Sequence, residues 1–254
     1  MGPTVEEICQ DITSKRKVID DDIDSLVCEF PALEGASQGD HFDKANNTPT
    51  SFLGLTPRGA NPYAEKLGLD SWEWKEGDSF SPNWSKSQQF DIIREYMLDA
   101  KEYFENHGIQ ISRLPRSIRR SLLDLKYNAG KASILNSEGK PNRHNNALKS
   151  FLSKPEADRT QLDVWNIQKE TLDIISDNGR FVRGLSNRRI KRYNQVSLET
   201  GLPKIVRQDW AKDNRSVRYF FDGTLPGTSK RTFRVGDYKS EDQYISYFEE
   251  RGFQ

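Results

Sequence analysis

Two stretches of apolar residues at helical spacing constrain the fold more than any other feature of this sequence. The first stripe is formed by Phe90, Ile93, Met97, Ala100 and Phe104. It predicts a long helix that can be capped by Ser85 or Ser87 and ends before Gly108. The second stripe follows Pro115 and stops at Gly130. Its buried face is predicted to consist of Ile118, Leu122, Leu123 and Leu125. Together the two patterns predict a mainly helical core.

Further helices and a few strands are predicted around this core. Helical spacing favours one or two helices within residues 5–33, a short helix at 61–69 that opens at Pro62, and further helices at 146–152, 157–176 and 182–198. Between His41 and Thr56, glycine, asparagine and proline break the helical period, which predicts a small β or irregular lobe. After Pro203, alternation around the Asp-Gly and Pro-Gly turns predicts two strands. The expected fold class is therefore α+β, mainly helical.

Composition excludes several classes of protein. A chain of 254 residues can bury its own core, and 38 basic against 38 acidic residues give no net charge to attract nucleic acid or an anionic membrane. Cys9 and Cys28 are too few for a disulfide scaffold, and whether they pair is left open. The 3 histidines are widely spaced, and no apolar run is long enough to span a membrane. We therefore expect a monomer with no cofactor, no metal, no nucleic acid partner and no membrane insertion.

The residues after the first helical segment carry the clearest chemistry. Glu34 follows an apolar helix end, where burial would keep its carboxyl group protonated, whereas Asp43 lies among polar residues and is expected to stay ionised. Hydrolysis of a glycosidic bond needs such a pair, one group to protonate the leaving oxygen and the other to activate water. Thr48, Thr50 or Ser51 could hold this water against Asp43. A Glu and an Asp at this spacing also arise by chance.

Two later segments, taken with this pair, resemble landmarks of the phage-type (T4-like) lysozyme family. One is a helix end with the sequence Tyr127-Asn128-Ala129-Gly130, and the other is a helix start, Gly184-Leu185-Ser186-Asn187-Arg188-Arg189. In that family the catalytic Glu stands in a Glu-Gly dipeptide and an Asp follows nine residues later, a spacing that Glu34-Gly35 and Asp43 reproduce. The resemblance covers about residues 22–195.

The resemblance implies a lysozyme-like fold with two lobes and a cleft between them. Residues 1–202 would form a muramidase domain, with a small lobe at about 30–83 and a helical lobe at about 84–202 that includes the N-terminal helices. Residues 203–254 would be a C-terminal extension with short strands. The implied activity is hydrolysis, without a cofactor, of the β-1,4 bond between N-acetylmuramic acid and N-acetylglucosamine in peptidoglycan.

The resemblance also assigns roles. Glu34 would be the general acid, and Asp43 with Thr50 or Thr48 would position water for inversion. Carboxyl groups roughly 6.5–9.5 Å apart would support inversion, and a separation of roughly 5 Å would favour retention. Family members usually follow the Asp with a Thr-x-Gly-x-Gly turn, whose second glycine is missing here. The threonine is therefore not assigned, and Thr50 is preferred to Thr48.

Other residues have both a binding and a packing interpretation. Asn128 is expected to close a helix end near the cleft and could touch sugar. Trp72 and Trp74 could stack on sugar rings, although aromatic residues more often fill a core. Arg188 and Arg189 are expected to pack and to pair at the base of the helical lobe.

Two functions from different classes are carried forward: a peptidoglycan hydrolase, and a glycan-binding module with the same fold and no catalysis. Both have peptidoglycan glycan strands as the partner. The N-terminal residues lack the pattern of a signal peptide. We therefore expect synthesis in the cytoplasm and action on the periplasmic or extracellular wall after release or delivery, as a phage endolysin or an antibacterial effector. An immunity protein or a delivery apparatus is then a candidate partner.

Overall fold

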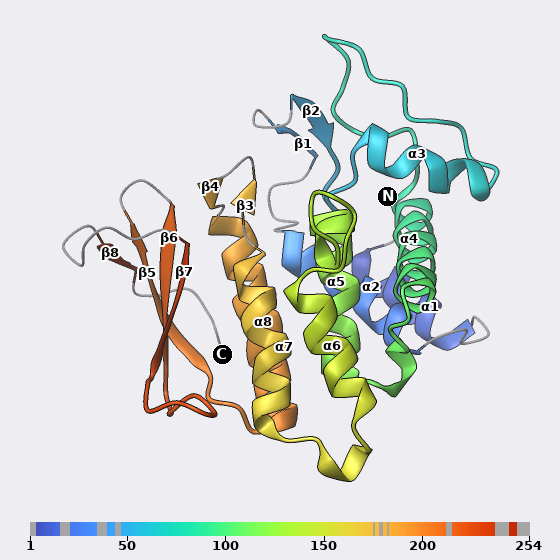
Figure 1. Cartoon of the computed structure of the whole chain (residues 1–254). Coiled ribbons are helices and arrows are strands. Elements are labelled where there is room, and N and C mark those ends of the chain that lie inside the picture. Colours follow the sequence, from blue (N-terminus) through green and yellow to red (C-terminus); the bar gives the residue numbers. More distant parts are fainter. Residues whose placement is uncertain are drawn as a thin grey trace. The chain divides into compact units, whose positions relative to one another are not determined.

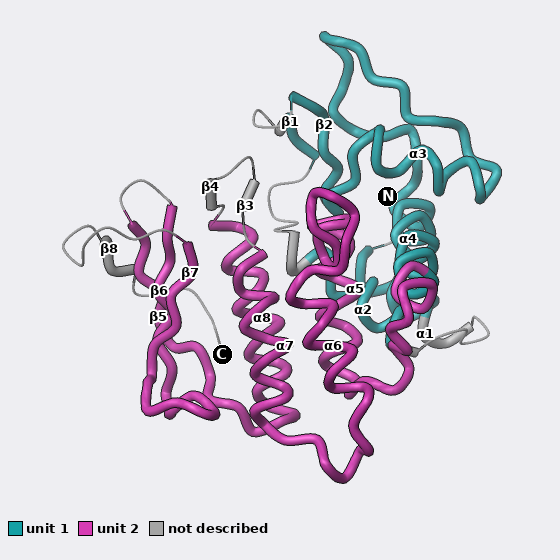
Figure 2. Tube along the Cα trace, in the orientation of Figure 1, with its two compact units in different colours: residues 1–102 teal, residues 103–254 magenta. Residues whose placement is uncertain are grey.

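The computed structural model describes residues 4–15, 21–34, 40–43, 47–174, 176–177, 180–181, 183–211, 215–236 and 244–247. Contacts divide the chain into two compact units, unit 1 (Met1–Glu102) and unit 2 (Tyr103–Gln254), coloured separately in Figure 2. Helices dominate, and the strands form small antiparallel sheets (Figure 1). The predicted α+β, mainly helical class is confirmed. The domains 1–202 and 203–254 stay a prediction. In the structure the N-terminal helices group with the small hairpin, and the C-terminal strands group with the later helices.

Unit 1 consists of helices and one β-hairpin. Its elements are α1 (Val5–Lys15), α2 (Asp21–Glu34), β1 (His41–Asp43), β2 (Thr48–Thr50), α3 (Pro57–Lys66) and most of α4 (Lys86–Asn106). The Ser85 hydroxyl accepts a hydrogen bond from the backbone of Gln88, whose side chain accepts one from the Ser85 backbone, so the predicted cap of α4 is confirmed. The prediction that a helix opens at Pro62 is wrong. Thr56 caps α3, Pro57 takes the first position and Pro62 lies inside the helix.

Two cross-links fix the helix that ends at Glu34. Cys9 and Cys28 form a disulfide between α1 and α2, with Cα atoms 5.7 Å apart. On α2, the Asp24 carboxylate accepts a hydrogen bond of 2.6 Å from the Arg94 guanidinium on α4, and both side chains are buried. Breaking a buried ion pair costs several kcal/mol because the remaining charge has no water around it. The position of α2 within unit 1 is thus held from two sides.

Unit 2 contains a row of helices and a sheet. The helices are α5 (Arg116–Ala129), α6 (Arg143–Ser153), α7 (Gln161–Asp173) and α8 (Arg183–Thr200). The 3-10 turn η2 (Ile111–Arg113) precedes α5, η3 (Gly130–Ser133) lies between α5 and α6, and η4 (Glu156–Asp158) lies between α6 and α7. As predicted, α5 begins after Pro115 and stops at Gly130, whose φ of 54° favours glycine. Helices predicted at 146–152, 157–176 and 182–198 correspond to α6, α7 and α8.

The C-terminal strands form a four-stranded antiparallel sheet in the order β7-β6-β5-β8. The strands are β5 (Ile205–Ala211), β6 (Ser216–Phe221), β7 (Thr232–Gly236) and β8 (Tyr244–Tyr247), and a short hairpin pairs β3 (Ser176–Asp177) with β4 (Arg180–Phe181). The two predicted strands are β6 and β7, while β5 and β8 were not predicted.

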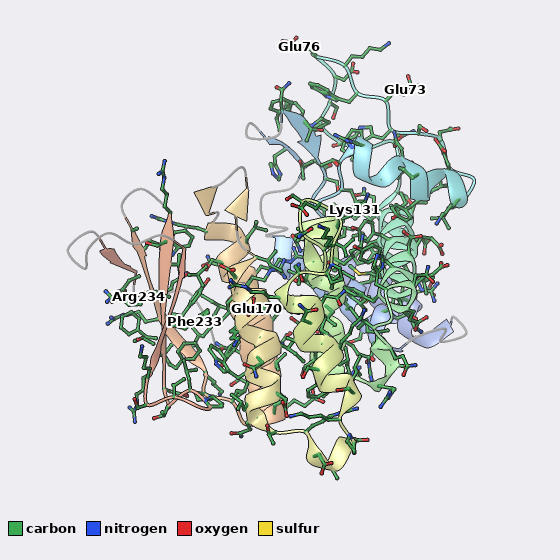
Figure 3. All side chains as sticks on the ribbon, in the orientation of Figure 1. Glu73, Glu76, Lys131, Glu170, Phe233 and Arg234 are labelled. Atoms are coloured by element: carbon green, nitrogen blue, oxygen red, sulfur yellow. A yellow bond between two sulfur atoms is a disulfide. The ribbon has the colours of Figure 1, made fainter. Side chains whose placement is uncertain are left out.

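One face of this sheet packs on the helices. The Trp165 ring of α7 meets the rings of Phe221 and Phe233 edge to face, with centroids 5.8 and 5.3 Å away. Tyr193 of α8 joins the same group, 5.7 Å from Phe221. Figure 3 shows Phe233 on the helix side of β7 and the next residue, Arg234, on the opposite side. The extension after Pro203 therefore shares its apolar core with α7 and α8.

A buried carboxylate joins α5 to α8. Asp124 is fully buried, and its oxygens accept hydrogen bonds of 2.6–3.1 Å from Arg188 and of 3.1 Å from Arg189. The Arg192 Nε lies 3.7 Å away. Burial alone raises the pKa of Asp124, but the guanidiniums of Arg188, Arg192 and Arg189 outweigh it and hold that pKa well below its usual range. Arg188 and Arg189 thus pack and pair inside unit 2, as predicted.

His144 of α6 lies in the same buried interior. Its Nδ1 is 2.6 Å from the carbonyl of Ser133, which makes Nδ1 the protonated nitrogen of a neutral ring. The Nε2 atom is buried and has no hydrogen-bond partner among the described residues. Burial lowers the pKa of His144 to about 4; the hydrogen bond with the Ser133 carbonyl offsets this only in part, and the positive charge of Arg189 adds a smaller lowering. Protonation of His144, which would add a positive charge close to Arg189, is therefore unfavourable.

Loss of the disulfide is expected to lower the free energy of unfolding of unit 1. Cys9 and Cys28 are 19 residues apart, and closing a loop of this length restricts the unfolded chain by about 3 kcal/mol. Urea unfolding of the oxidised protein, with and without reductant, measures the effect. The double variant Cys9→Ser/Cys28→Ser is the control and should not respond to reductant. Equal stability of the oxidised and reduced protein would contradict the prediction.

Stability is expected to fall on mild acidification because of His144. An unfolded histidine takes up a proton near pH 6.5, whereas the folded chain resists it down to a pKa of about 4. The unfolded state binds more protons between these values, so the stabilisation is complete above pH 6.5 and is lost as pH falls toward 4. The total is about 3 kcal/mol. Urea unfolding across this range should show a shallower pH dependence in His144→Gln, with His107→Gln as the control. The same pH dependence in His144→Gln and the wild type would exclude His144 as its source.

Candidate active site

Both predicted carboxylates stand at the ends of elements in unit 1. Glu34 is the last residue of α2, and Asp43 is the last residue of β1. Their side chains, and the whole of Gly35, lie outside the described residues. The choice between inversion and retention by carboxyl separation therefore stays a prediction.

The hairpin register brings Asp43 together with the two candidate threonines. β1 and β2 pair antiparallel with Asp43 opposite Thr48, Phe42 opposite Pro49 and His41 opposite Thr50. Directly opposite residues share a face of a sheet, and so do residues two apart along a strand. Positions 41, 43, 48 and 50 thus belong to one face of the hairpin.

The hydroxyl groups near this face differ in what they already bind. Thr50 Oγ1 is buried and has no hydrogen-bond partner among the described residues. Thr48 Oγ1 reaches the Pro49 carbonyl only at 3.5 Å. The buried Ser51 Oγ accepts hydrogen bonds of 3.3 Å from the backbone N–H groups of Leu53 and Leu55. A buried hydroxyl without a partner is unusual and is satisfied by a bound water or ligand. Thr50 is therefore the best placed of the three to hold a water.

Side-chain hydrogen bonds close the turn after β2, where the second glycine of the family pattern is missing. Ser51 donates its backbone N–H to the Leu55 carbonyl at 2.9 Å, and its carbonyl accepts from Gly54 at 2.8 Å. An Asp40 carboxylate oxygen accepts the Phe52 N–H at 2.8 Å. Sequence reasoning did not identify this role of Asp40 and Ser51, because contacts between a side chain and a distant backbone group leave no periodic signal. Backbone bonds of Ser51 and a side-chain bond of Asp40 thus hold this turn, which lacks the second glycine.

The two tryptophans proposed as sugar contacts take part in packing. Trp72 is 3% exposed and meets Trp84 edge to face at 5.8 Å, while its backbone N–H donates to Asn61. A ring this deeply buried has no face for a sugar, so the packing interpretation holds for Trp72. Trp74 is half-buried, with its ring centroid 5.4 Å from that of Phe42. Phe42 alternates with Asp43 along β1, which puts this aromatic contact on the other hairpin face. Stacking of Trp74 on sugar stays a prediction.

Asn128 stands in the last turn of α5 in unit 2. Its side-chain N–H donates to the Asp124 carbonyl at 2.7 Å, and its carboxamide oxygen accepts no hydrogen bond from a described residue. The Asn128 side-chain nitrogen thus helps to close the helix, as expected, and the side-chain oxygen can accept a hydrogen bond from a ligand. Contact with sugar stays a prediction.

The described residues contain neither a metal-binding cluster nor a membrane-spanning helix. No group of His, Cys, Asp and Glu side chains there could hold a metal ion. In the same part of the chain, no helix is long and apolar enough to cross a membrane.

Comparison with known proteins adds one finding. No family model matches the chain, and no curated protein matches it. Among solved structures, the active form of the P1 phage endolysin Lyz is similar, with a TM-score of 0.49 and 14% sequence identity over 78% of this chain and 95% of that chain. The TM-score and the sequence identity are both low. The case for a function therefore lies with the residues of this chain.

Replacing two neighbouring hydroxyls should have opposite effects on stability. Thr50→Val keeps the shape of the side chain and removes a buried hydroxyl that has no partner among the described residues, so the free energy of unfolding is expected to stay equal or to rise by up to about 1 kcal/mol. Ser51→Ala removes an acceptor from two backbone N–H groups and is expected to lower it by about 1–2 kcal/mol. Urea unfolding compares the two variants. A loss in Thr50→Val as large as in Ser51→Ala would show that Thr50 is a structural residue.

Proposed function

We propose that this chain is a peptidoglycan hydrolase of the muramidase type, which cleaves the β-1,4 bond between N-acetylmuramic acid and N-acetylglucosamine. One observation carries the proposal. A Glu-Gly helix end is followed by a hairpin in which the position of Asp43 shares a face with Thr50, whose buried hydroxyl has no partner among the described residues. The order of the three sequence motifs supports the same assignment.

The chemistry follows from the two carboxyl groups. Glu34, protonated at the apolar end of α2, would donate its proton to the glycosidic oxygen as the bond to the anomeric carbon breaks. Asp43, ionised, would take a proton from the water that attacks the opposite face of the sugar. The Thr50 hydroxyl would accept or donate a hydrogen bond to hold this water in line. Proton exchange with solvent then restores both carboxyl groups, and the configuration of the product is inverted.

The disulfide supports a site of action outside the cytoplasm. Disulfides persist in the periplasm and in extracellular spaces and are rare in the reducing cytoplasm. Cys9 and Cys28 are bonded across α1 and α2, so the helix that ends at Glu34 is reinforced under oxidising conditions. This agrees with action on the wall after release as an endolysin or delivery as an effector, with an immunity protein or a delivery apparatus as candidate partners.

A glycan-binding module without catalysis is the second candidate. The turn after β2, held by Ser51 and Asp40 in place of the family glycines, favours it because the loop that presents the water has changed. Such a module would bind peptidoglycan and release no fragments. Product analysis separates the two functions directly.

Digestion of purified peptidoglycan with mass analysis of the soluble fragments tests the proposal. The wild type should release disaccharide-peptides that end in reducing N-acetylmuramic acid. Removal of the general acid in Glu34→Gln, or of the base in Asp43→Asn, is expected to slow release by about 100-fold or more. Thr50→Val should be slowed while staying folded, and Thr48→Val, on the same hairpin face, is the matched control that should retain more activity.

Three results would contradict the proposal. If a folded Glu34→Gln variant released fragments at the wild-type rate, Glu34 would not be the general acid. Binding to peptidoglycan without any fragments from the wild type would favour the glycan-binding module. Fragments that end in reducing N-acetylglucosamine would mean that the enzyme cleaves the other glycosidic bond.

A further inference from the structure

A polar pocket lies within unit 2, and none of the proposed catalytic residues line it. Its volume is 600 Å³, and its lining includes residues from η2, the start of α5, η4, the start of α7 and the end of α8. The charged residues that line it are Arg113, Arg119, Arg159, Glu156 and Glu199. Three arginines and two glutamates thus line the pocket.

Two of the guanidiniums are held on one short turn. Arg119 Nη1 donates to the carbonyls of Leu114 and Ser112, at 2.8 and 3.3 Å. Arg159 Nη1 donates to the carbonyl of Arg113, at 3.2 Å. These three acceptors are consecutive in the chain. Two positive charges that come from α5 and from the segment before α7 are therefore fixed close to each other.

Neutral groups bind the guanidiniums of Arg113 and Arg159. Arg113 donates to the side-chain oxygen of Gln110 at 3.0 Å and to the Leu152 carbonyl at 3.2 Å. The Arg159 guanidinium lies over the Phe151 ring, 4.7 Å from its centroid, and its Nε is buried without a hydrogen-bond partner among the described residues. Carbonyls and a ring orient these charges without neutralising them.

The carboxylates of the pocket offset this charge in part. Glu199 accepts the backbone N–H of Ser117 at 2.8 Å, so it lies at the start of α5. Glu156 begins η4. Helices α5 and α7 both begin at the pocket, at Pro115 and Thr160, and the N-terminal end of a helix carries a partial positive charge. The interior of the pocket is accordingly suited to an anion.

We propose that this pocket binds a phosphate group carried by a polyol. Guanidinium groups in a fixed orientation bind phosphate oxygens through paired N–H donors. The volume exceeds that of a phosphate alone, and the hydroxyl oxygens of Ser112, Thr160 and Thr200 at the wall can accept hydrogen bonds from the hydroxyls of a polyol. Binding here does not require Glu34 or Asp43, so this site is independent of the proposed hydrolysis.

Titration with glycerol 3-phosphate and with inorganic phosphate, followed by calorimetry, tests the proposal on the whole chain. Arg113→Gln and Arg159→Gln are each expected to weaken binding of glycerol 3-phosphate by about tenfold, because each removes a charged donor. Arg143→Gln is the matched control. It removes one positive charge from α6, outside this pocket, and should bind like the wild type. Affinity should also fall as salt is added.

Additional ligands and variants serve as controls for this titration. Glycerol alone should not bind, and Glu34→Gln should bind glycerol 3-phosphate like the wild type, which separates this site from catalysis. If a Gln variant is unstable by circular dichroism, Arg113→Lys keeps the charge and should retain more binding than Arg113→Gln. Short glycerol phosphate oligomers and vesicles of phosphatidylglycerol then distinguish a polymer from a lipid headgroup. No binding of any phosphate probe, or equal weakening in Arg143→Gln, would overturn the proposal.

Discussion

The structure of unit 2 depends on one buried carboxylate. Asp124 has no contact with water, so its charge is tolerated only because guanidiniums from α8 surround it. Arg188 and Arg192 are one helical turn apart and Arg189 is adjacent, so a single face of α8 must be turned toward α5. Rotation or sliding of α8 would leave several charges buried without partners. A hydrophobic contact would tolerate such a shift, and this ionic contact does not.

Unit 1 is organised by different constraints. The disulfide to α1 and the Asp24–Arg94 ion pair to α4 hold α2. The hairpin is held by the register of β1 with β2 and by the bonds of Asp40 and Ser51. The end of the helix and the face of the hairpin that carries Thr50 thus rest on fixed supports. The role proposed for Thr50, to orient a water, would need this rigidity, and the Thr50 hydroxyl has no partner among the described residues.

The sequence predicted elements best where local signals agreed. α4 and α5 have apolar stripes together with capping residues, and both were placed within a residue or two of their ends. Pro62 was misread as a helix start because the capping hydroxyl of Thr56 is a weaker signal than a proline. β5 was missed because Gln208 and Asp209 are both buried and break the alternation that marks a strand. The grouping of Arg188 and Arg189 around Asp124 joins positions 64 and 65 residues apart, which no local pattern encodes. For the site, the spacing of Glu34 and Asp43 was readable, whereas the difference between Thr50, Thr48 and Ser51 depends on which hydroxyl already has a partner.

Zero net charge hides a strong local separation of charge. Two of the places in unit 2 where positive side chains gather are the surroundings of Asp124 in the interior and the pocket beside η2. At the first place a carboxylate is the acceptor, and at the second the guanidiniums of Arg113 and Arg159 are held by carbonyls, an amide and a ring. The first arrangement is complete without a ligand and fixes two helices. In the second, Arg113 and Arg159 have no carboxylate partner among the described residues, and the proposed anion site rests on this difference. The net charge counts arginines that pair with a buried carboxylate and arginines that are bound by neutral groups in the same way. It therefore does not indicate whether the chain binds an anion.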